Sequence, residues 1–160
     1  MLALTLTAEL NGITDLRPAD TADSPYYYTF KVQCTSCRET HANWVGVNRH
    51  EMNEQSGSRG EANFVWKCKN CKRESHATIK TGPAAYEHSE PPKTTKLIEI
   101  DCRGLEFTEF KPDGEWLAKG IDSGSKFEAI DLSEGEWFDY DEKAGDEVSV
   151  KEIKWAIVRA

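Results

Sequence analysis

Cys34-Thr-Ser-Cys37 and Cys68-Lys-Asn-Cys71 are the two stretches around which the rest of the chain is organised. Each is a C-x-x-C turn, in which both sulfurs face one point and backbone N–H groups of the turn point at them. Four thiolates in two such pairs suit a tetrahedral zinc ion. We therefore predict one Zn²⁺ per chain in a closed structural site, bound by Cys34, Cys37, Cys68 and Cys71.

Other uses of these cysteines fit the sequence less well. A thioredoxin-like dithiol normally precedes a helix in a βαβ unit, and no such unit is predicted here. Disulfides are disfavoured because no signal peptide is recognised and 160 residues can build a core without them. His41 and His76 follow the two turns, and either could replace a cysteine in a Cys₃His site, although the four cysteines already complete the shell.

Basic residues flank both turns and form what we call the basic rim: Arg38, Lys67, Lys69, Lys72 and Arg73. Four thiolates around one dication leave a formal charge of about −2, which the basic rim would balance. The alternative is a contact with a phosphate backbone. We favour the first interpretation, because the whole chain carries a net charge of −8 and would repel a polyanion.

The composition predicts a soluble protein. Mean hydropathy is −0.65 and no long apolar run is present, which argues against a membrane-spanning helix. Reduced cysteines at metal-binding spacing, without an export signal, indicate the cytoplasm or the nucleus. Residues 1–80 hold 10 Lys and Arg and 9 Asp and Glu, whereas residues 81–160 hold 10 and 19. The acidic second half is either a docking surface for a basic partner or a solvated face.

Alternating apolar residues predict strands along the chain, and no segment has a convincing helical period. The strand over residues 26–34 ends at the first cysteine turn. The second turn is predicted at the tip of a hairpin between residues 63–67 and 74–81. Further strands are predicted at residues 2–10, 40–47, 96–102, 105–111, 115–119, 126–132, 136–140 and 148–158, with a polar run at 14–24 and a mobile polar loop at 49–62.

A proline-rich linker from Gly82 to Pro92 divides the chain into residues 1–82, which carry the cysteine turns, and residues 93–160, which do not. Phe30-Lys-Val-Gln-Cys34 lines up with Ile98-Glu-Ile-Asp-Cys102, which suggests an internal repeat. We predict an all-β fold, an antiparallel sandwich or barrel-like body made of two similar β-units with a pseudo-twofold relation. Cys102 is then a buried bystander, and a reactive thiol is the alternative.

Longer motifs accompany the two turns: Gly57-Ser-Arg-Gly60-Glu-Ala-Asn-Phe64, Cys102-Arg-Gly-Leu105 and Trp137-Phe-Asp-Tyr-Asp141-Glu-Lys-Ala-Gly145. Taken together, they make a chain that resembles a eukaryotic family of small CXXC-motif-containing zinc-binding proteins. The resemblance spans nearly the whole chain. It implies a β-rich protein with one zinc on Cys34, Cys37, Cys68 and Cys71, and it carries no established reaction.

No nucleophile, base and orienting group can be assembled from this sequence, so we expect no catalytic residues and no enzymatic activity. We expect a monomeric zinc protein that presents a rigid β-surface to a protein partner. The alternative is metal transfer or thiol redox chemistry with a metal-handling protein, because soft thiolates also suit Cu(I). Nucleic-acid binding through the basic rim and Tyr26–Tyr28 is a third reading, and we expect neither nucleic acid nor a membrane as a partner.

Overall fold

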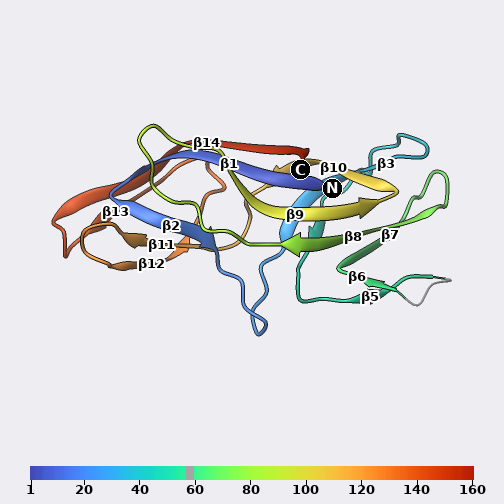
Figure 1. Ribbon diagram of the computed structural model, residues 1–160, viewed down its shortest axis with the longest axis horizontal. Helices are drawn as coiled ribbons and strands as arrows, with labels where there is room; N and C mark the ends of the chain where they lie inside the picture. The colour runs from blue at the N-terminus through green and yellow to red at the C-terminus, as the bar shows by residue number, and fades with distance from the viewer. Residues whose placement is uncertain (57–59) are drawn as a thin grey trace.

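Antiparallel β-sheets make up the structure, which is a computed structural model that describes residues 1–56 and 60–160. Fourteen strands and no helix occur in these residues, so the all-β prediction is confirmed. Accordingly, no helix in the described chain is long and apolar enough to cross a bilayer. Figure 1 shows an elongated body, with both termini near the middle of its length.

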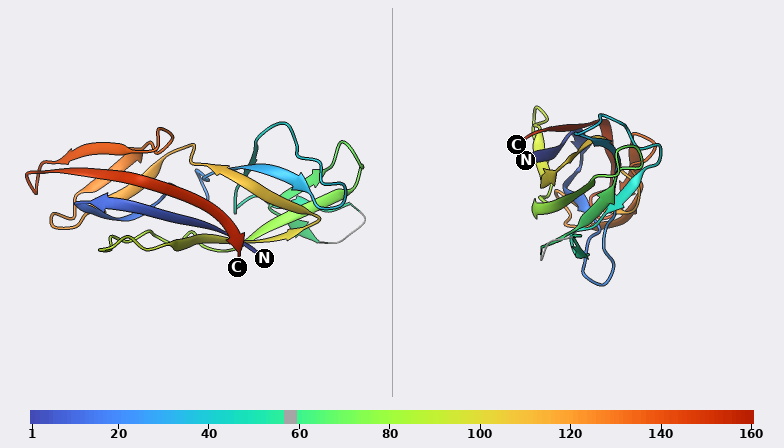
Figure 2. Two further views of the ribbon diagram at one scale, coloured as in Figure 1. Left: turned by 90° about the horizontal axis from the view of Figure 1, so that it is seen from above. Right: turned by 90° about the vertical axis from the view of Figure 1, so that its right-hand side faces the viewer.

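A six-stranded sheet runs through the whole length of the molecule (Figure 1). Its strands, in spatial order, are β13 (Trp137–Asp141), β14 (Asp146–Arg159), β1 (Leu2–Asn11), β9 (Thr95–Arg103), β8 (Glu74–Thr81) and β7 (Phe64–Lys67). β1 is central, and its first five residues are all buried, so both faces of this strand are covered. The sheet curls, as the end-on view in Figure 2 shows, which gives the predicted barrel-like character.

Three smaller sheets accompany the large one. The first two have three strands each: β10 (Leu105–Lys111), β3 (Tyr28–Cys34) and β4 (Val45–Val47) in one, and β12 (Lys126–Ile130), β11 (Trp116–Gly120) and β2 (Ile13–Pro18) in the other. The third is the short pair β5 (Asn53–Glu54) and β6 (Glu61–Ala62). In Figure 1 the β2–β11–β12 sheet lies at one end of the long axis and the β3 and β5–β6 strands lie at the other.

Strands from the two sequence halves lie side by side in three of the four described sheets. β1 lies between β9 and β14, β3 pairs with β10, and β2 pairs with β11. The predicted internal repeat is not confirmed, and the division into residues 1–82 and 93–160 stays a prediction. The proline-rich segment between them packs onto the protein through Tyr86, whose hydroxyl accepts the Ala8 N–H (3.0 Å) and donates to the Lys93 carbonyl (2.6 Å).

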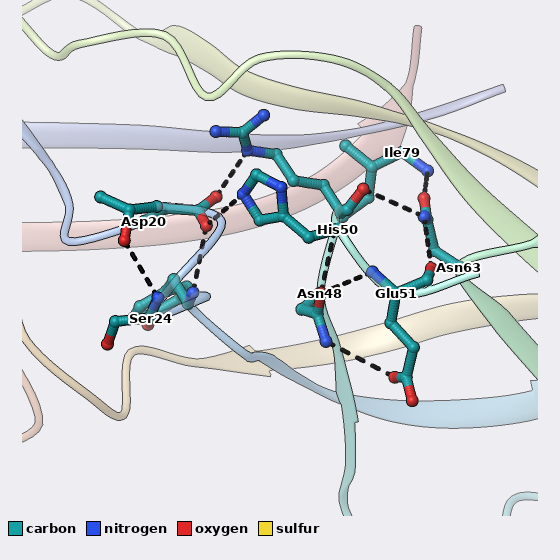
Figure 3. Close-up of polar contacts among 10 residues, drawn as sticks. Asp20, Ser24, Asn48, His50, Glu51, Asn63 and Ile79 are labelled. Carbon is teal, nitrogen blue, oxygen red and sulfur yellow. Dashed lines mark hydrogen bonds and ion pairs between the residues drawn. The ribbon is translucent and has the colours of Figure 1, made fainter.

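Part of the predicted mobile loop is held firmly at its base (Figure 3). Asn63 is 3 % exposed, and its side-chain amide donates to the carbonyl of Glu51 (2.9 Å) and accepts the N–H of Ile79 (2.7 Å). The buried Asp20 carboxylate accepts from Arg49 Nε at 2.7 Å and lies 3.2 Å from His50 Nε2. These contacts tie residues 48–52 to the body, while residues 57–59 lie outside the described part of the chain.

Candidate metal centre

The two cysteine turns come from different sheets and meet at one point. β3 ends at Cys34, so the first turn extends from the three-stranded β10–β3–β4 sheet. β7 ends at Lys67, and Cys68 opens the second turn at the tip of the β7–β8 hairpin, as predicted. A metal ion at this point would therefore join the edge of the six-stranded sheet to a smaller sheet.

Both turns have the same backbone conformation. The Arg38 N–H donates to the Cys34 carbonyl at 2.9 Å, and the Lys72 N–H donates to the Cys68 carbonyl at the same distance. Arg38 and Lys72 also share a φ of 66°, a left-handed conformation that non-glycine residues rarely adopt. Two unrelated stretches hold this strained turn, which indicates that the turn serves to aim the cysteine sulfurs.

The four sulfurs form a compact cluster with the geometry of a zinc site. Cys34 Sγ lies 3.7 Å from Cys71 Sγ, and Cys37 Sγ lies 3.6 Å from Cys68 Sγ. All four ligand atoms lie within 4.8 Å of one another. In a tetrahedral site, four sulfurs at about 2.3 Å from a single zinc ion lie about 3.8 Å from one another. The donor set therefore fits Zn²⁺. The four predicted ligands are thus brought together by the fold.

Hydrogen bonds to the sulfurs prepare two of them as thiolates. The backbone N–H of Cys37 lowers the pKa of Cys34, and the side-chain amide of Asn70 is the main cause that lowers the pKa of Cys37 to about 6. The N–H of Arg73 also bonds the Cys71 sulfur, but burial and the three neighbouring sulfurs raise the pKa of Cys71 to about 11. Thiolates this close together repel one another, which opposes the ionisation of a further sulfur. A bound dication neutralises this repulsion and so favours all four thiolates.

Replacing Asn70 by alanine is expected to make zinc retention more sensitive to acid. Without the amide, the pKa of Cys37 rises towards its ordinary value. A thiolate with a lowered pKa supports metal binding until the pH falls through that pKa, so the variant should release zinc at a pH higher by up to about one unit. The measurement is zinc release against pH with a chromogenic chelator. Asn43→Ala, at an exposed position nearby, is the control, and superimposable curves for both variants would contradict the role of Asn70.

Among the described residues, the other candidate ligands, His41 and His76, lie outside the four-sulfur cluster. His41 contacts the Trp66 ring edge-on at 5.8 Å between centroids, and His76 lies on β8 opposite Val65. Cys102 lies on β9, and burial raises the pKa of its thiol to about 12, which disfavours the reactive-thiol alternative. All residues of the basic rim are exposed around the site.

A hollow beside the metal centre was not predicted from the sequence. It has a volume of about 320 Å³, and its lining includes His41, Trp66, Cys68 and Asn70. Little in the sequence indicates it, because Asn70 lies inside one C-x-x-C turn whereas its side-chain amide lowers the pKa of Cys37 in the other turn. The hollow is wide enough for a small molecule or a partner side chain, and it lies beside the metal ligand Cys68.

Comparisons with known proteins agree with this geometry. The chain matches the family model described as "CXXC motif containing zinc binding protein, eukaryotic" over residues 3–158. UPF0587 protein C2D10.03c of Schizosaccharomyces pombe is 44% identical, with 99% of this chain and 98% of that protein covered. The CXXC motif containing zinc binding protein of Homo sapiens is 36% identical, with the same coverage. The crystal structure of C1orf123 superimposes with a TM-score of 0.89 at 34% identity over 99% of both chains.

Proposed function

Because this chain belongs to the eukaryotic family of CXXC motif containing zinc binding proteins, we propose that it is a non-enzymatic protein-interaction module with a structural zinc. The observation that carries the proposal is the saturated donor set. Four sulfurs fill the tetrahedral shell of one zinc ion, which leaves no open position for a substrate or a reactive water. Catalytic zinc sites keep such a position open.

The position of the centre also supports a structural role. Cys34 and Cys68 are 0 % and 1 % exposed and belong to turns from two different sheets. An ion shared by both turns fixes the sheets relative to each other, so its binding free energy becomes folding free energy. The result is a rigid β-surface, and rigid surfaces bind partners at a lower entropic cost.

Charge supports a basic protein as the partner. The second half of the chain carries an excess of nine acidic charges, which attracts a basic surface and repels a polyanion. The module is then a monomer that binds neither nucleic acid nor membrane. Its thiolate ligands suit the reducing cytoplasm or nucleus.

Metal transfer is the second candidate function, and the hollow beside Cys68 is the observation that favours it. Cys68 lines this hollow, and Cys37 and Cys71 are only half-buried, so an incoming thiolate from a metal-handling protein has access to the ligand sulfurs. Thiolate sites also accept Cu(I), which gives such a protein two possible cargoes. Exchange of this kind needs an ion that leaves quickly.

Zinc exchange distinguishes the two functions. Zinc-loaded protein is mixed with an excess of a chromogenic chelator at neutral pH, and release is followed over time. A structural ion stays bound for hours because its release requires local unfolding. Release within seconds, or stoichiometric displacement by Cu(I) with the fold unchanged, would contradict the structural role and favour transfer. The interaction role is tested separately by chemical cross-linking in cell extract, and the absence of any saturable protein cross-link would contradict it.

A further inference from the structure

β13 is a sheet edge, at the end of the molecule opposite the metal centre (Figures 1 and 2). Among the described strands it pairs only with β14, so its other side has no strand partner, and the Tyr140 N–H donates to the Asp139 carboxylate of the same strand at 2.7 Å. Such an edge is a template for an additional strand. The edge strand at the other side of the same sheet, β7, differs in that its Phe64, Val65 and Trp66 are all partly buried.

Large apolar side chains are exposed on this edge. Phe138 and Tyr140 are 59 % and 51 % exposed, and they lie on the same face of β13 because they are two residues apart. With Ile121, this end of the molecule carries three of the seven exposed large apolar residues in the described chain. Exposed aromatic residues grouped in this way are typical of interaction surfaces.

A hollow of about 380 Å³ adjoins the two aromatic rings, and its lining includes Asn11, Glu147, Ser149 and Lys151. Ser149 lies directly opposite Phe138 in the β13–β14 pair and is 3 % exposed. Its hydroxyl has no hydrogen-bond partner among the described residues. A buried polar atom without a hydrogen-bond partner destabilises the folded protein. A polar group of a ligand that formed a hydrogen bond with this hydroxyl would therefore stabilise the complex.

The electrostatic character of the edge is strongly acidic. Residues 131–147 contain eight Asp and Glu and one Lys, and all of the acidic residues except Asp141 are exposed. A second hollow next to the first shares Asn11 and Glu147 with it and adds Asp122 and Asp146 to its lining. The Nζ of Lys151 lies 5.8 Å from the centroid of the Phe138 ring, and among the described residues Lys151 is the single basic side chain that lines either hollow.

We propose that β13 is a docking edge for an extended basic segment of a partner protein, which adds to the sheet as a strand beside β13. Its backbone pairs with the free side of β13, an apolar side chain packs on Phe138 and Tyr140, and Lys or Arg side chains on the opposite face of the added strand lie near Asp139. The proposal rests on the interaction role proposed above and names the partner chemistry. A second copy of this chain is a poor occupant, because two acidic edges repel each other.

The test is a titration of the zinc-loaded full chain, labelled with ¹⁵N, with a peptide of about ten alternating lysine and valine residues. The expected result is saturable binding with amide shifts concentrated on β13, and affinity that falls as salt is raised. Two comparison peptides separate the contributions. An alternating glutamate–valine peptide tests charge, and a lysine–valine peptide with prolines at every third position tests strand pairing, because proline cannot complete a ladder. Both should bind at least tenfold more weakly.

Variants then locate the site. The double substitution Phe138→Ala with Tyr140→Ala should weaken binding about tenfold or more, and Tyr27→Ala, at a residue 53 % exposed just before β3, should leave it unchanged. Equal binding of the proline-containing peptide, shifts spread over the acidic surface, or an unchanged affinity of the double variant would each overturn the proposal. Concentration-dependent dimerisation that the double variant abolishes would also overturn it, in favour of a second copy.

The same double variant separates the two proposals in the extract cross-linking experiment. If its protein cross-links match those of the wild type, the docking edge is wrong and the interaction role stands. Loss of specific cross-links in the double variant, with normal zinc content and thermal stability, supports both. If neither protein yields a saturable cross-link, the interaction role itself is contradicted.

Discussion

Cys68→Ser is expected to abolish both zinc binding and stable folding. The side chain is 1 % exposed, and its sulfur lies 3.6 Å from that of Cys37 in the four-sulfur cluster. A serine oxygen does not replace a thiolate, so the site is left with three good ligands. A structural zinc site of this type contributes on the order of 10 kcal/mol to folding, which is comparable to the whole stability of a domain. Zinc content after desalting and a circular-dichroism melt measure the two effects.

Cys102→Ser is the matched control for this prediction. Cys102 lies on β9, opposite Ala77 of β8 and outside the sulfur cluster. Its replacement removes a partly buried thiol and nothing that holds the metal, so we expect full zinc content and a stability loss below about 2 kcal/mol. Equal zinc loss from the two variants would show that the assignment of the ligands is wrong.

The metal ligands could be predicted from the sequence because the relevant geometry is local. Within each C-x-x-C turn the direction of both sulfurs follows from the conformation of about five consecutive residues, and the same backbone bond closes both turns. Only the meeting of the two turns requires the tertiary fold, and the preference of zinc for four sulfurs makes that meeting predictable too. The strands predicted over residues 2–10 and 26–34 are found at Leu2–Asn11 and Tyr28–Cys34, and they could be predicted for the same local reason, because apolar residues alternate along them.

Strand pairing could not be predicted in this way. Alternation predicts that β1 is a strand, but not that its first five residues are buried on both faces, nor that its neighbours are β9 and β14, which lie about ninety or more residues away along the chain. β2 was missed because Ile13–Pro18 is a mixed polar stretch, and its pairing with β11 makes it a strand. The resemblance of residues 30–34 to 98–102 does not correspond to equivalent positions in one sheet, because β3 and β9 belong to different sheets.

Polar contacts that fix the loops were equally hidden in the sequence. The side chain of Asn63 holds Glu51 and Ile79, twelve and sixteen residues away, and nothing in the composition of residues 49–62 signals these bonds. Asp20 reaches across twenty-nine residues to Arg49. Buried backbone groups need hydrogen-bond partners, and side chains such as that of Asn63 provide them. The sequence alone does not show which side chain bonds to which backbone group.

Trp116→Ala is expected to lower the free energy of unfolding by about 3–5 kcal/mol. Trp116 lies on β11, is 0 % exposed, and has its ring 5.5 Å from the rings of both Tyr26 and Trp155. Trp155 belongs to β14, so this contact joins the β12–β11–β2 sheet to the six-stranded sheet at a distance from the cysteine turns. Truncation leaves a large cavity between two sheets that cannot collapse onto each other without moving their strands.

Urea denaturation of the zinc-loaded protein measures the effect of Trp116→Ala, and Phe138→Ala serves as the control. Phe138 is another large aromatic residue, but it is 59 % exposed, so its truncation should change stability by no more than about 0.5 kcal/mol. Zinc content should stay at one per folded chain in both variants, because neither position contacts the cysteine turns. Truncation of a tryptophan buried in a rigid core normally costs several kcal/mol. A loss below about 1 kcal/mol for Trp116→Ala would therefore mean that other contacts hold the two sheets together.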